Sequence, residues 1–357
     1  MIVRFFRSGL LALGLLLLLL VLGLLGWRAV RQQEIRKATH IAVPPGIARL
    51  EAVELGGVQQ WIQIRGQDTS RPLLLILHGG PGLPEMPYEY VNAGLEKYFI
   101  VVEWDQRGAG KSFQPDISGE SMRLEQFVND AQQLTEMLCA RFHQKQVFLV
   151  GHSSGTVIGM MLAQRAPQLV RAYVGISQIA NLQESEKLLY NFAVQSAKAK
   201  GDTKALRELA KIGPPPFHDA AELQVSQKWV NHFAPDRFAF LSLDRWRLAC
   251  ASPAYSLLDF VRFFRGAKFS FAHLWRELFA TNLFRQIPRV DVPVYFFLGR
   301  HDHVVTGSVA EKYFNTLEAP KGKQFFWFEH SAHWPQLEEP QKFQEIMIDR
   351  VLHENDG

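Results

Sequence analysis

Short apolar runs, each ended by a Gly-rich or polar turn, recur along most of this chain. Runs of this length are typical of strands that are covered on both faces. Longer stretches of helical period, such as 124–142, separate most of them. This alternation predicts an α/β fold with a mostly parallel sheet and helices on both faces. The predicted strands are 58–65, whose alternating pattern indicates a half-exposed edge strand, and 73–77, 99–104, 147–150, 172–176, 294–298 and 324–328.

The strand–helix alternation breaks between residues 178 and 290. This segment is helical in pattern and rich in aromatic residues, and it precedes the strand predicted at 294–298. We therefore expect a helical cap (178–290) inserted between a first part (51–177) and a second part (291–357) of one core domain. The helices predicted in the cap are 182–199, 204–212, 221–233, 254–264 and 271–284.

The amino-terminal segment has a different pattern. No charged residue lies between Ser8 and Trp27, and basic residues flank this segment on both sides. Twenty helical residues span about 30 Å, the thickness of a bilayer core. The apolar run exceeds the roughly 7–15 residues of a signal peptide and lacks a small-residue cleavage site. The pattern favours an uncleaved single-pass membrane anchor at 1–30, followed by a polar linker at 31–50.

The orientation of this anchor depends on weaker signals. Arg4 and Arg7 precede the apolar run, and Arg28 and Arg31 follow it, so the flanking charge is similar on both sides. Large carboxyl-terminal domains are translocated largely regardless of charge. We therefore expect an exported catalytic domain on a membrane of the bacterial inner-membrane type.

Composition narrows the classes of function. Of the 357 residues, 47% are hydrophobic, which is enough for a sizeable core, and the formal net charge is only +4. Lysine and arginine are scattered beyond the amino-terminal flanks, so nucleic acid is a poor candidate partner. The chain has no C-x-x-C motif and no metal-spaced His/Cys cluster, so we expect neither a metal nor a cofactor. Cys139 and Cys250 are either free thiols or a pair.

The most informative motif is Gly151-His152-Ser153-Ser154-Gly155. It lies between the strand predicted at 147–150 and a predicted helix at 156–166. A nucleophile elbow needs this strand–turn–helix context and small residues on either side of a strained serine. The motif therefore predicts Ser153 as a nucleophile at the amino-terminal end of a helix.

A second Gly-rich segment, His78-Gly79-Gly80-Pro81-Gly82, follows the strand predicted at 73–77. In a serine hydrolase, the loop at this place supplies one backbone N–H group to the oxyanion hole, and the residue after the nucleophile supplies the other. We therefore expect the two donors at Gly80 and Ser154.

Candidates for an acid and a base follow the last two predicted strands. Asp302 lies just after 294–298, and His333 lies in the loop after 324–328. An aspartate that accepts a hydrogen bond from a histidine fixes its tautomer, and the histidine acts as general base and acid. The order Ser–Asp–His along the chain is that of α/β hydrolases. His330 is the rival base.

These motifs together resemble the α/β-hydrolase superfamily. The segments 78–82 and 104–112 (Trp-Asp-Gln-Arg-Gly-Ala-Gly-Lys-Ser) are similar to those of its prolyl aminopeptidase (proline iminopeptidase) branch. The resemblance covers the chain from about residue 58 onward. It implies a mostly parallel sheet of the eight-stranded type. It also implies that Ser153 is the nucleophile, Asp302 the acid and His333 the base.

The chain also departs from that branch. Its members resemble Gly-Gly-Ser-Trp-Gly at the elbow, where this chain has Gly-His-Ser-Ser-Gly. They hold the free amine of the substrate with cap carboxylates, which no motif places here. The segment 105–112 is expected to brace a loop rather than to take part in chemistry.

The expected reaction is a two-step acyl transfer through a serine ester. The resemblance implies a proline-iminopeptidase-like aminopeptidase acting on small molecules or short peptides. The alternatives are a membrane-anchored carboxylesterase or lipase acting on apolar esters and, further, a non-catalytic binding protein with a hydrolase fold. The oligomeric state is open as well.

Overall fold

The computed structural model describes residues 2–234 and 243–355, and side chains from residue 13 onward except that of residue 220. An eight-stranded sheet forms the centre, with the strand order β1-β2-β4-β3-β5-β6-β7-β8. All neighbouring pairs from β4 to β8 are parallel, whereas β1 and β2 are antiparallel to their neighbours. The strands are β1 (Ile47–Leu55), β2 (Val58–Gly66), β3 (Leu73–Leu77), β4 (Ile100–Asp105), β5 (Val147–His152), β6 (Val170–Ile176), β7 (Val294–Gly299) and β8 (Lys323–Phe328).

The prediction of an edge strand at 58–65 was wrong in one respect. β2 pairs with β4 on one side and with β1 on the other, so β1 is the edge. Gly56 and Gly57, with φ of 53° and 75°, form the tight turn that folds β1 back onto β2. A two-residue glycine turn of this kind favours a hairpin. The alternating pattern of β2 therefore reflects its position next to the edge strand, not a position at the edge itself.

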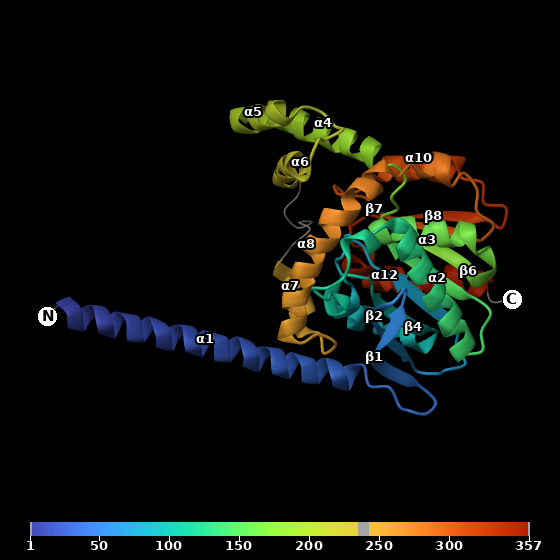
Figure 1. Cartoon of the computed structure of the whole chain (residues 1–357), viewed down its shortest axis with the longest axis horizontal. Helices are drawn as coiled ribbons and strands as arrows, with labels where there is room; N and C mark the ends of the chain where they lie inside the picture. The colour runs from blue at the N-terminus through green and yellow to red at the C-terminus, as the bar shows by residue number, and fades with distance from the viewer. Residues whose placement is uncertain (1, 235–242, 356–357) are drawn as a thin grey trace.

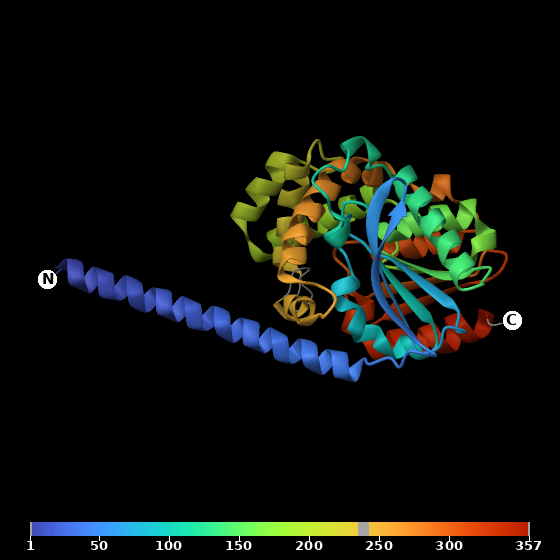
Figure 2. The same cartoon turned by 60° about the horizontal axis from the view of Figure 1, so that its bottom comes forward.

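Helices cover both faces of the sheet, as predicted (Figures 1 and 2). Successive residues of β3 separate the two layers: Leu73 and Leu75 pack with the first, and Leu74 and Ile76 with the second. The first layer contains α2 (Leu124–Arg141), α3 (Ser154–Arg165) and α10 (Gly307–Thr316). The second contains the 3-10 segment Met86–Lys97, α12 (Pro340–Ile346) and the π-helical turn Met347–Leu352, while the short α11 (Pro335–Glu338) follows the β8 loop.

A helical cap is inserted after β6, and the chain returns to the sheet at β7 (Figure 1). Its helices are α4 (Leu182–Lys200), α5 (Thr203–Ile212), α6 (Ala220–Phe233), α7 (Leu243–Ala251), α8 (Leu257–Ala280) and α9 (Leu283–Gln286). Residues 235–242, which belong to the predicted cap, lie outside the described part of the chain.

The two last helices predicted for the cap are largely one helix, α8. Gly266 lies in its middle, where a Cβ atom would stand 2.6 Å from the carbonyl oxygen of Gly108. The glycine therefore allows the helix to cross closely over the loop that follows β4, and does not end it.

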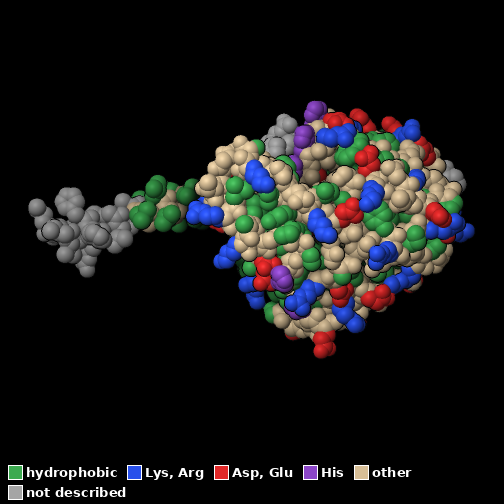
Figure 3. All heavy atoms as spheres, turned by 90° about the horizontal axis from the view of Figure 1, so that it is seen from above, with side chains coloured by type: hydrophobic (Ala, Val, Ile, Leu, Met, Phe, Trp, Pro, Cys, Tyr) green, Lys and Arg blue, Asp and Glu red, His purple; other side chains and the backbone are tan. Residues whose placement is uncertain are grey.

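The amino-terminal helix α1 (Ile2–Ala38) extends past the predicted anchor boundary at residue 30 and through part of the predicted linker. Its apolar stretch stands clear of the domain (Figures 1 and 3). Within Leu13–Ala38 the mean hydropathy of the best window is 2.3, and none of that window is buried. The side chains of Arg4, Arg7 and Ser8 lie outside the described part.

The carboxyl-terminal part of α1 contacts the cap. The guanidinium group of Arg28 donates to the carbonyl oxygens of Cys250 (3.1 Å) and Tyr255, and the Gln32 amide donates to the carbonyl oxygen of Ser252 (2.7 Å). These bonds attach the part of α1 that follows the apolar run to the α7–α8 connection.

Candidate active site

Ser153 lies between β5 and α3 in a strained backbone conformation. Its φ and ψ are 50° and −120°, and a positive φ is rare for a residue other than glycine. The flanking glycines are required by close contacts. A Cβ atom at Gly155 would lie 2.1 Å from the carbonyl oxygen of Leu77, and one at Gly151 would lie 2.7 Å from that of Gly155. The Gly-x-Ser-x-Gly pattern therefore reflects real steric limits.

His333 and Asp302 are joined by a hydrogen bond although 31 residues separate them. Nδ1 of His333 donates to Oδ2 of Asp302 over 2.9 Å. The other carboxylate oxygen, Oδ1, accepts from the backbone N–H groups of Val304 (2.8 Å) and Val305 (2.9 Å). Burial alone would raise the pKa of Asp302, but His333 and these N–H groups hold it below its ordinary value. The aspartate is therefore ionised, and it fixes the tautomer with the proton on Nδ1 and a lone pair on Nε2.

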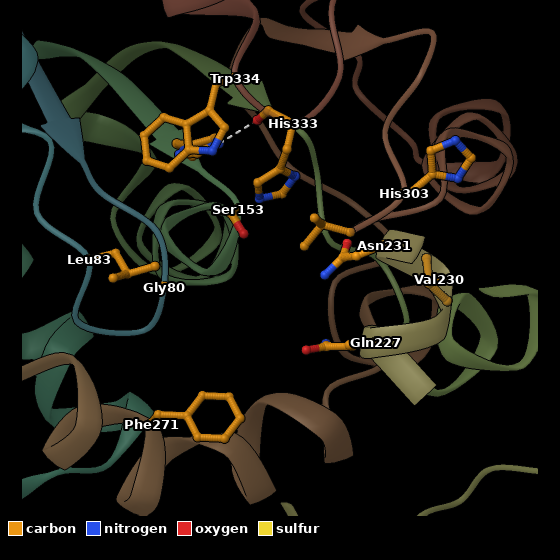
Figure 4. A pocket seen from close by; sticks show the side chains of 12 residues that line it. Gly80, Leu83, Ser153, Gln227, Val230, Asn231, Phe271, His303, His333 and Trp334 are labelled. Atoms are coloured by element: carbon orange, nitrogen blue, oxygen red, sulfur yellow. Dashed lines mark hydrogen bonds between the residues drawn. The ribbon is translucent and has the colours of Figure 1, made fainter. Parts of the chain in front are cut away.

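Ser153 and His333 meet at a cavity of about 210 Å³ between the sheet and the cap. Figure 4 shows the imidazole ring of His333 beside the Ser153 hydroxyl, and both residues line the same pocket. Cap helices α6 and α8 form the opposite wall, through Gln227, Asn231 and Phe271. The strand ends and the inserted cap thus bring together residues from four distant parts of the chain.

The loop after β3 lies directly against the elbow. A Cβ atom at Gly79 would stand 2.8 Å from Cβ of Ser153, so only glycine fits there. Gly80, with φ of 123°, lines a second cavity together with Ser153 and Ser154. The two predicted oxyanion donors therefore border the same space as the serine.

Two residues that the sequence analysis did not assign, His152 and Glu85, form a buried pair at this site, and His152 lines the same cavity as Ser153. His152 donates from Nδ1 to Glu85 Oε1 (2.6 Å) and from Nε2 to the backbone carbonyl oxygen of His333 (2.7 Å). Since both ring nitrogens face acceptors, both carry protons. Burial alone would lower the pKa of His152, but the Glu85 carboxylate raises it above its ordinary value. Gln336 holds the second oxygen of Glu85 over 2.9 Å.

The sequence signal for this pair was visible only as the histidine at the elbow, where this chain departs from the prolyl aminopeptidase pattern. Nothing in their spacing joins residues 67 positions apart. The fold joins them because β3 and β5 are neighbours.

The other histidines near the site have different surroundings. His330, the rival base, is exposed, and its backbone N–H donates to Glu339. His303 lines the pocket and stacks on Phe192 at 4.9 Å between ring centroids. His78 is buried, and burial lowers its pKa to about 4, so it is neutral and accepts at Nε2 from the backbone N–H of Gln106.

A buried carboxylate in the cap faces the same space. Glu186, on α4, lines the cavity that contains Gly80, Ser153 and Ser154. It is only 2% exposed, and its Oε2 atom has no hydrogen-bond partner among the described residues. Burial raises the pKa of Glu186 to about 7, although a hydrogen bond with Gln227 opposes this effect. A carboxylate in this state would be stabilised by a cation.

The segment 105–112 braces the loop after β4, as expected. Arg107 and Asp130 form a buried ion pair at 2.8 Å, and Arg107 also donates to the carbonyl oxygen of Gly56. Asp105 accepts from Tyr255 and from the backbone N–H of Lys111.

Cys139 and Cys250 are separate free thiols. Within the described residues, no group of three or more His, Cys, Asp or Glu side chains is arranged to hold a metal ion.

Comparisons with known proteins agree with this architecture. The family described as "alpha/beta hydrolase fold" matches residues 72–340. A protein named "Probable aminopeptidase YbaC" from Bacillus subtilis (strain 168) is 35% identical over 316 residues, which are 86% of this chain and 97% of that protein. A proline iminopeptidase from Heyndrickxia coagulans is 23% identical over 77% of this chain and 89% of its own length.

Solved structures with the same fold include VinJ, with a TM-score of 0.65 at 21% identity over 85% of this chain and 98% of that one. Another is the proline iminopeptidase of Mycobacterium smegmatis, with a TM-score of 0.55 at 20% identity over 86% of this chain and 99% of that one. The eight-stranded sheet, the inserted cap and these relatives together show that the chain belongs to the α/β-hydrolase family and is homologous to aminopeptidases.

Proposed function

We propose that this protein is a serine aminopeptidase of the proline iminopeptidase type, which releases an amino-terminal residue through an acyl-enzyme. The observation that carries the proposal is Glu186, a buried carboxylate with an unpartnered oxygen in a cavity shared with Ser153. Sequence similarity to aminopeptidases supports the same substrate class.

In the proposed mechanism, Ser153 attacks the carbonyl carbon while Nε2 of His333 takes the hydroxyl proton. Asp302 stabilises the resulting imidazolium, because its carboxylate is ionised and hydrogen-bonded to Nδ1. The backbone N–H groups of Gly80 and Ser154 stabilise the oxyanion, each by about 3 kcal/mol. His333 then protonates the leaving amine, and an activated water hydrolyses the acyl-enzyme.

Glu186 would select substrates with a free amino terminus. An ammonium group placed beside its Oε2 atom would supply the cation that this buried carboxylate lacks, and would return its pKa toward the ordinary value. An N-blocked peptide or a simple ester offers no such charge. We therefore expect Glu186 to contribute to the turnover of amine substrates and little to that of esters.

The test compares proline β-naphthylamide with p-nitrophenyl esters of increasing chain length, using Ser153→Ala as the blank. Glu186→Gln should lower kcat/KM for the amide by about 100-fold, the effect of about 3 kcal/mol, and change ester turnover little. Glu184→Gln is the matched control, because Glu184 lies on the same helix but pairs with Lys312 at the surface.

The same assay separates the other substrate classes. Ester turnover without amide turnover would identify a carboxylesterase and contradict the aminopeptidase proposal. Fluorophosphonate labelling that persists in Ser153→Ala would contradict the assignment of the nucleophile. An absence of labelling in the native enzyme would indicate a non-catalytic member of the family.

We also propose that α1 is an uncleaved single-pass anchor with the catalytic domain on the exported side. Leu13–Trp27 is uncharged and exposed, and it is long enough to cross much of a bilayer. The full chain should stay with membranes after alkaline carbonate washing, whereas a chain that begins at residue 28 should become soluble. Retention of that shortened chain, or a mature protein that begins after Trp27, would contradict the anchor.

A further inference from the structure

Cap helix α8 carries an exposed apolar stripe. Leu257, Leu258, Val261 and Phe264 are 54%, 73%, 53% and 56% exposed. Their spacing of one, four and seven residues places them on one face of the helix. Phe260, Phe263 and Gly266, on the other face, are buried. Outside α1, most of the large apolar side chains that the described structure exposes lie on α7 and α8.

Basic residues border this stripe. Arg262, Arg265 and Lys268 are exposed on the same helix. Asp259, the acidic residue on this part of α8, is only 4% exposed, and it binds Lys111 at 2.6 Å and Arg262 at 3.2 Å. An apolar face bordered by arginine and lysine is typical of helices that lie in a membrane interface, where the long side chains reach anionic headgroups.

The stripe begins beside the apolar part of α1. Leu257 lines one cleft together with Leu25 and Ala29. The hydrogen bonds from Arg28 and Gln32 fix this junction. Because the uncharged run ends at Trp27, a bilayer crossed by α1 would have its surface close to Leu257. Figures 1 and 2 both show α8 running across the direction of α1, which is the direction of a bilayer surface when α1 stands upright.

We propose that the stripe of α8 (Leu257, Leu258, Val261 and Phe264) docks into the interface of the same anionic phospholipid bilayer that α1 spans. This inference rests on the proposed anchoring by α1. Two observations favour lipid over a second copy of the chain: the stripe continues directly from the membrane-spanning segment, and its border is basic. The same helix forms a wall of the cavity through Phe271, so the bilayer would hold the cap at a fixed height above Ser153.

The experiment uses the full chain, one copy per nanodisc, with phosphatidylglycerol and phosphatidylcholine. A polarity-sensitive nitrobenzoxadiazole label is attached at Leu258→Cys, in a background with Cys139→Ser and Cys250→Ser. Interfacial helices bury their apolar face by about 5–10 Å. We therefore expect a blue-shifted emission at Leu258→Cys, quenching by lipids with brominated acyl chains, and protection from aqueous iodide.

Leu188→Cys is the matched control, because Leu188 is an exposed leucine on another cap helix, α4, and is not part of the α8 stripe. Its label should stay accessible to iodide. The unmodified chain gives a second measurement: hydroxyl-radical oxidation of Phe264 should fall several-fold in nanodiscs relative to detergent solution, with that of Leu188 unchanged. Replacing phosphatidylglycerol by phosphatidylcholine should weaken the protection of both probes on α8.

The outcomes distinguish this inference from the anchor. If the protein elutes with nanodiscs but the label at residue 258 is as accessible as that at 188, the anchor stands and docking by α8 is wrong. If the protein does not elute with nanodiscs, the anchor fails and the inference falls with it. Protection at residue 258 that appears only when two copies share one disc would assign the stripe to a protein interface instead.

Discussion

His333 and His330 stand three residues apart in one loop, yet their surroundings differ. His333 is 3% exposed and bonded to Asp302, whereas His330 is exposed. We expect His333→Ala to lower kcat by about 10⁴-fold, since this variant lacks the proposed proton acceptor for Ser153. His330→Ala should leave kcat within about twofold, because surface changes have small effects. Steady-state kinetics on the same substrate decide between the two histidines, and a large loss in His330→Ala alone would reverse the assignment.

His152, paired with Glu85, contacts the proposed base His333 in two ways: through a hydrogen bond to its backbone carbonyl oxygen and through a ring contact of 4.9 Å between centroids. Glu85→Gln removes the buried anion that keeps His152 doubly protonated, so the bond from Nε2 to the His333 carbonyl oxygen weakens. We expect kcat to fall by about 10–100-fold with KM little changed, because the imidazole loses its position and not its substrate. The pH profile of kcat should shift as well.

Glu85→Asp is the control for that change, since it retains the charge with a shorter reach. Partial recovery of kcat in Glu85→Asp is the expected result. Equal losses in kcat and in thermal stability for both variants would indicate a structural role only.

Among the secondary-structure elements, α8 crosses closely over the loop after β4 because Gly266 has no side chain there. Alanine is favoured over glycine in a helix by about 1 kcal/mol. Here, however, the added Cβ atom would meet the Gly108 carbonyl oxygen at 2.6 Å and Cβ of Phe113 at 3.2 Å. We expect Gly266→Ala to lower the free energy of unfolding by about 1–3 kcal/mol, because the helix must move away from the core domain.

The matched variant for this prediction is Lys268→Ala, on the exposed face of the same helix. It should change stability by less than about 0.5 kcal/mol. Denaturant unfolding in detergent measures both variants, and a stabilised Gly266→Ala would show that the crossing is not close.

At the scale of the whole molecule, buried carboxyl groups make stability depend on pH. Burial raises the pKa of Glu89 from 4.5 to about 7. The folded state therefore binds this proton more tightly than the unfolded state, so the stabilisation is complete below about pH 4.5 and is lost as the pH rises through about 7. Each pKa unit corresponds to about 1.4 kcal/mol, which gives a loss of up to about 3 kcal/mol from Glu89.

Glu89→Gln should flatten this dependence between about pH 5 and 8, because glutamine keeps an acceptor for the Ser252 hydroxyl without titrating. Thermal unfolding of both proteins across this range measures the effect. Parallel curves for the native protein and the variant would show that Glu89 does not titrate in this range.

The features that could be predicted from the amino-acid sequence are those that depend on local pattern. The buried strands are continuous apolar runs, Gly151 is required by contacts within the elbow itself, and Asp302 and His333 lie in the loops that follow strands. These signals are local because backbone sterics and strand burial act over short stretches of chain. The uncharged run of α1 is local in the same sense.

Contacts between residues that are distant in sequence could not be predicted, because they depend on how the whole chain folds. The pairing of Glu85 with His152 needs β3 beside β5, the position of Glu186 over Ser153 needs the cap folded back onto the sheet, and β1 becomes the edge only because it pairs with β2. The proposed docking of the α8 stripe on a bilayer likewise depends on its position beside α1. Such contacts join residues tens to hundreds of positions apart, and their energies depend on burial and on partner geometry, which no local pattern carries.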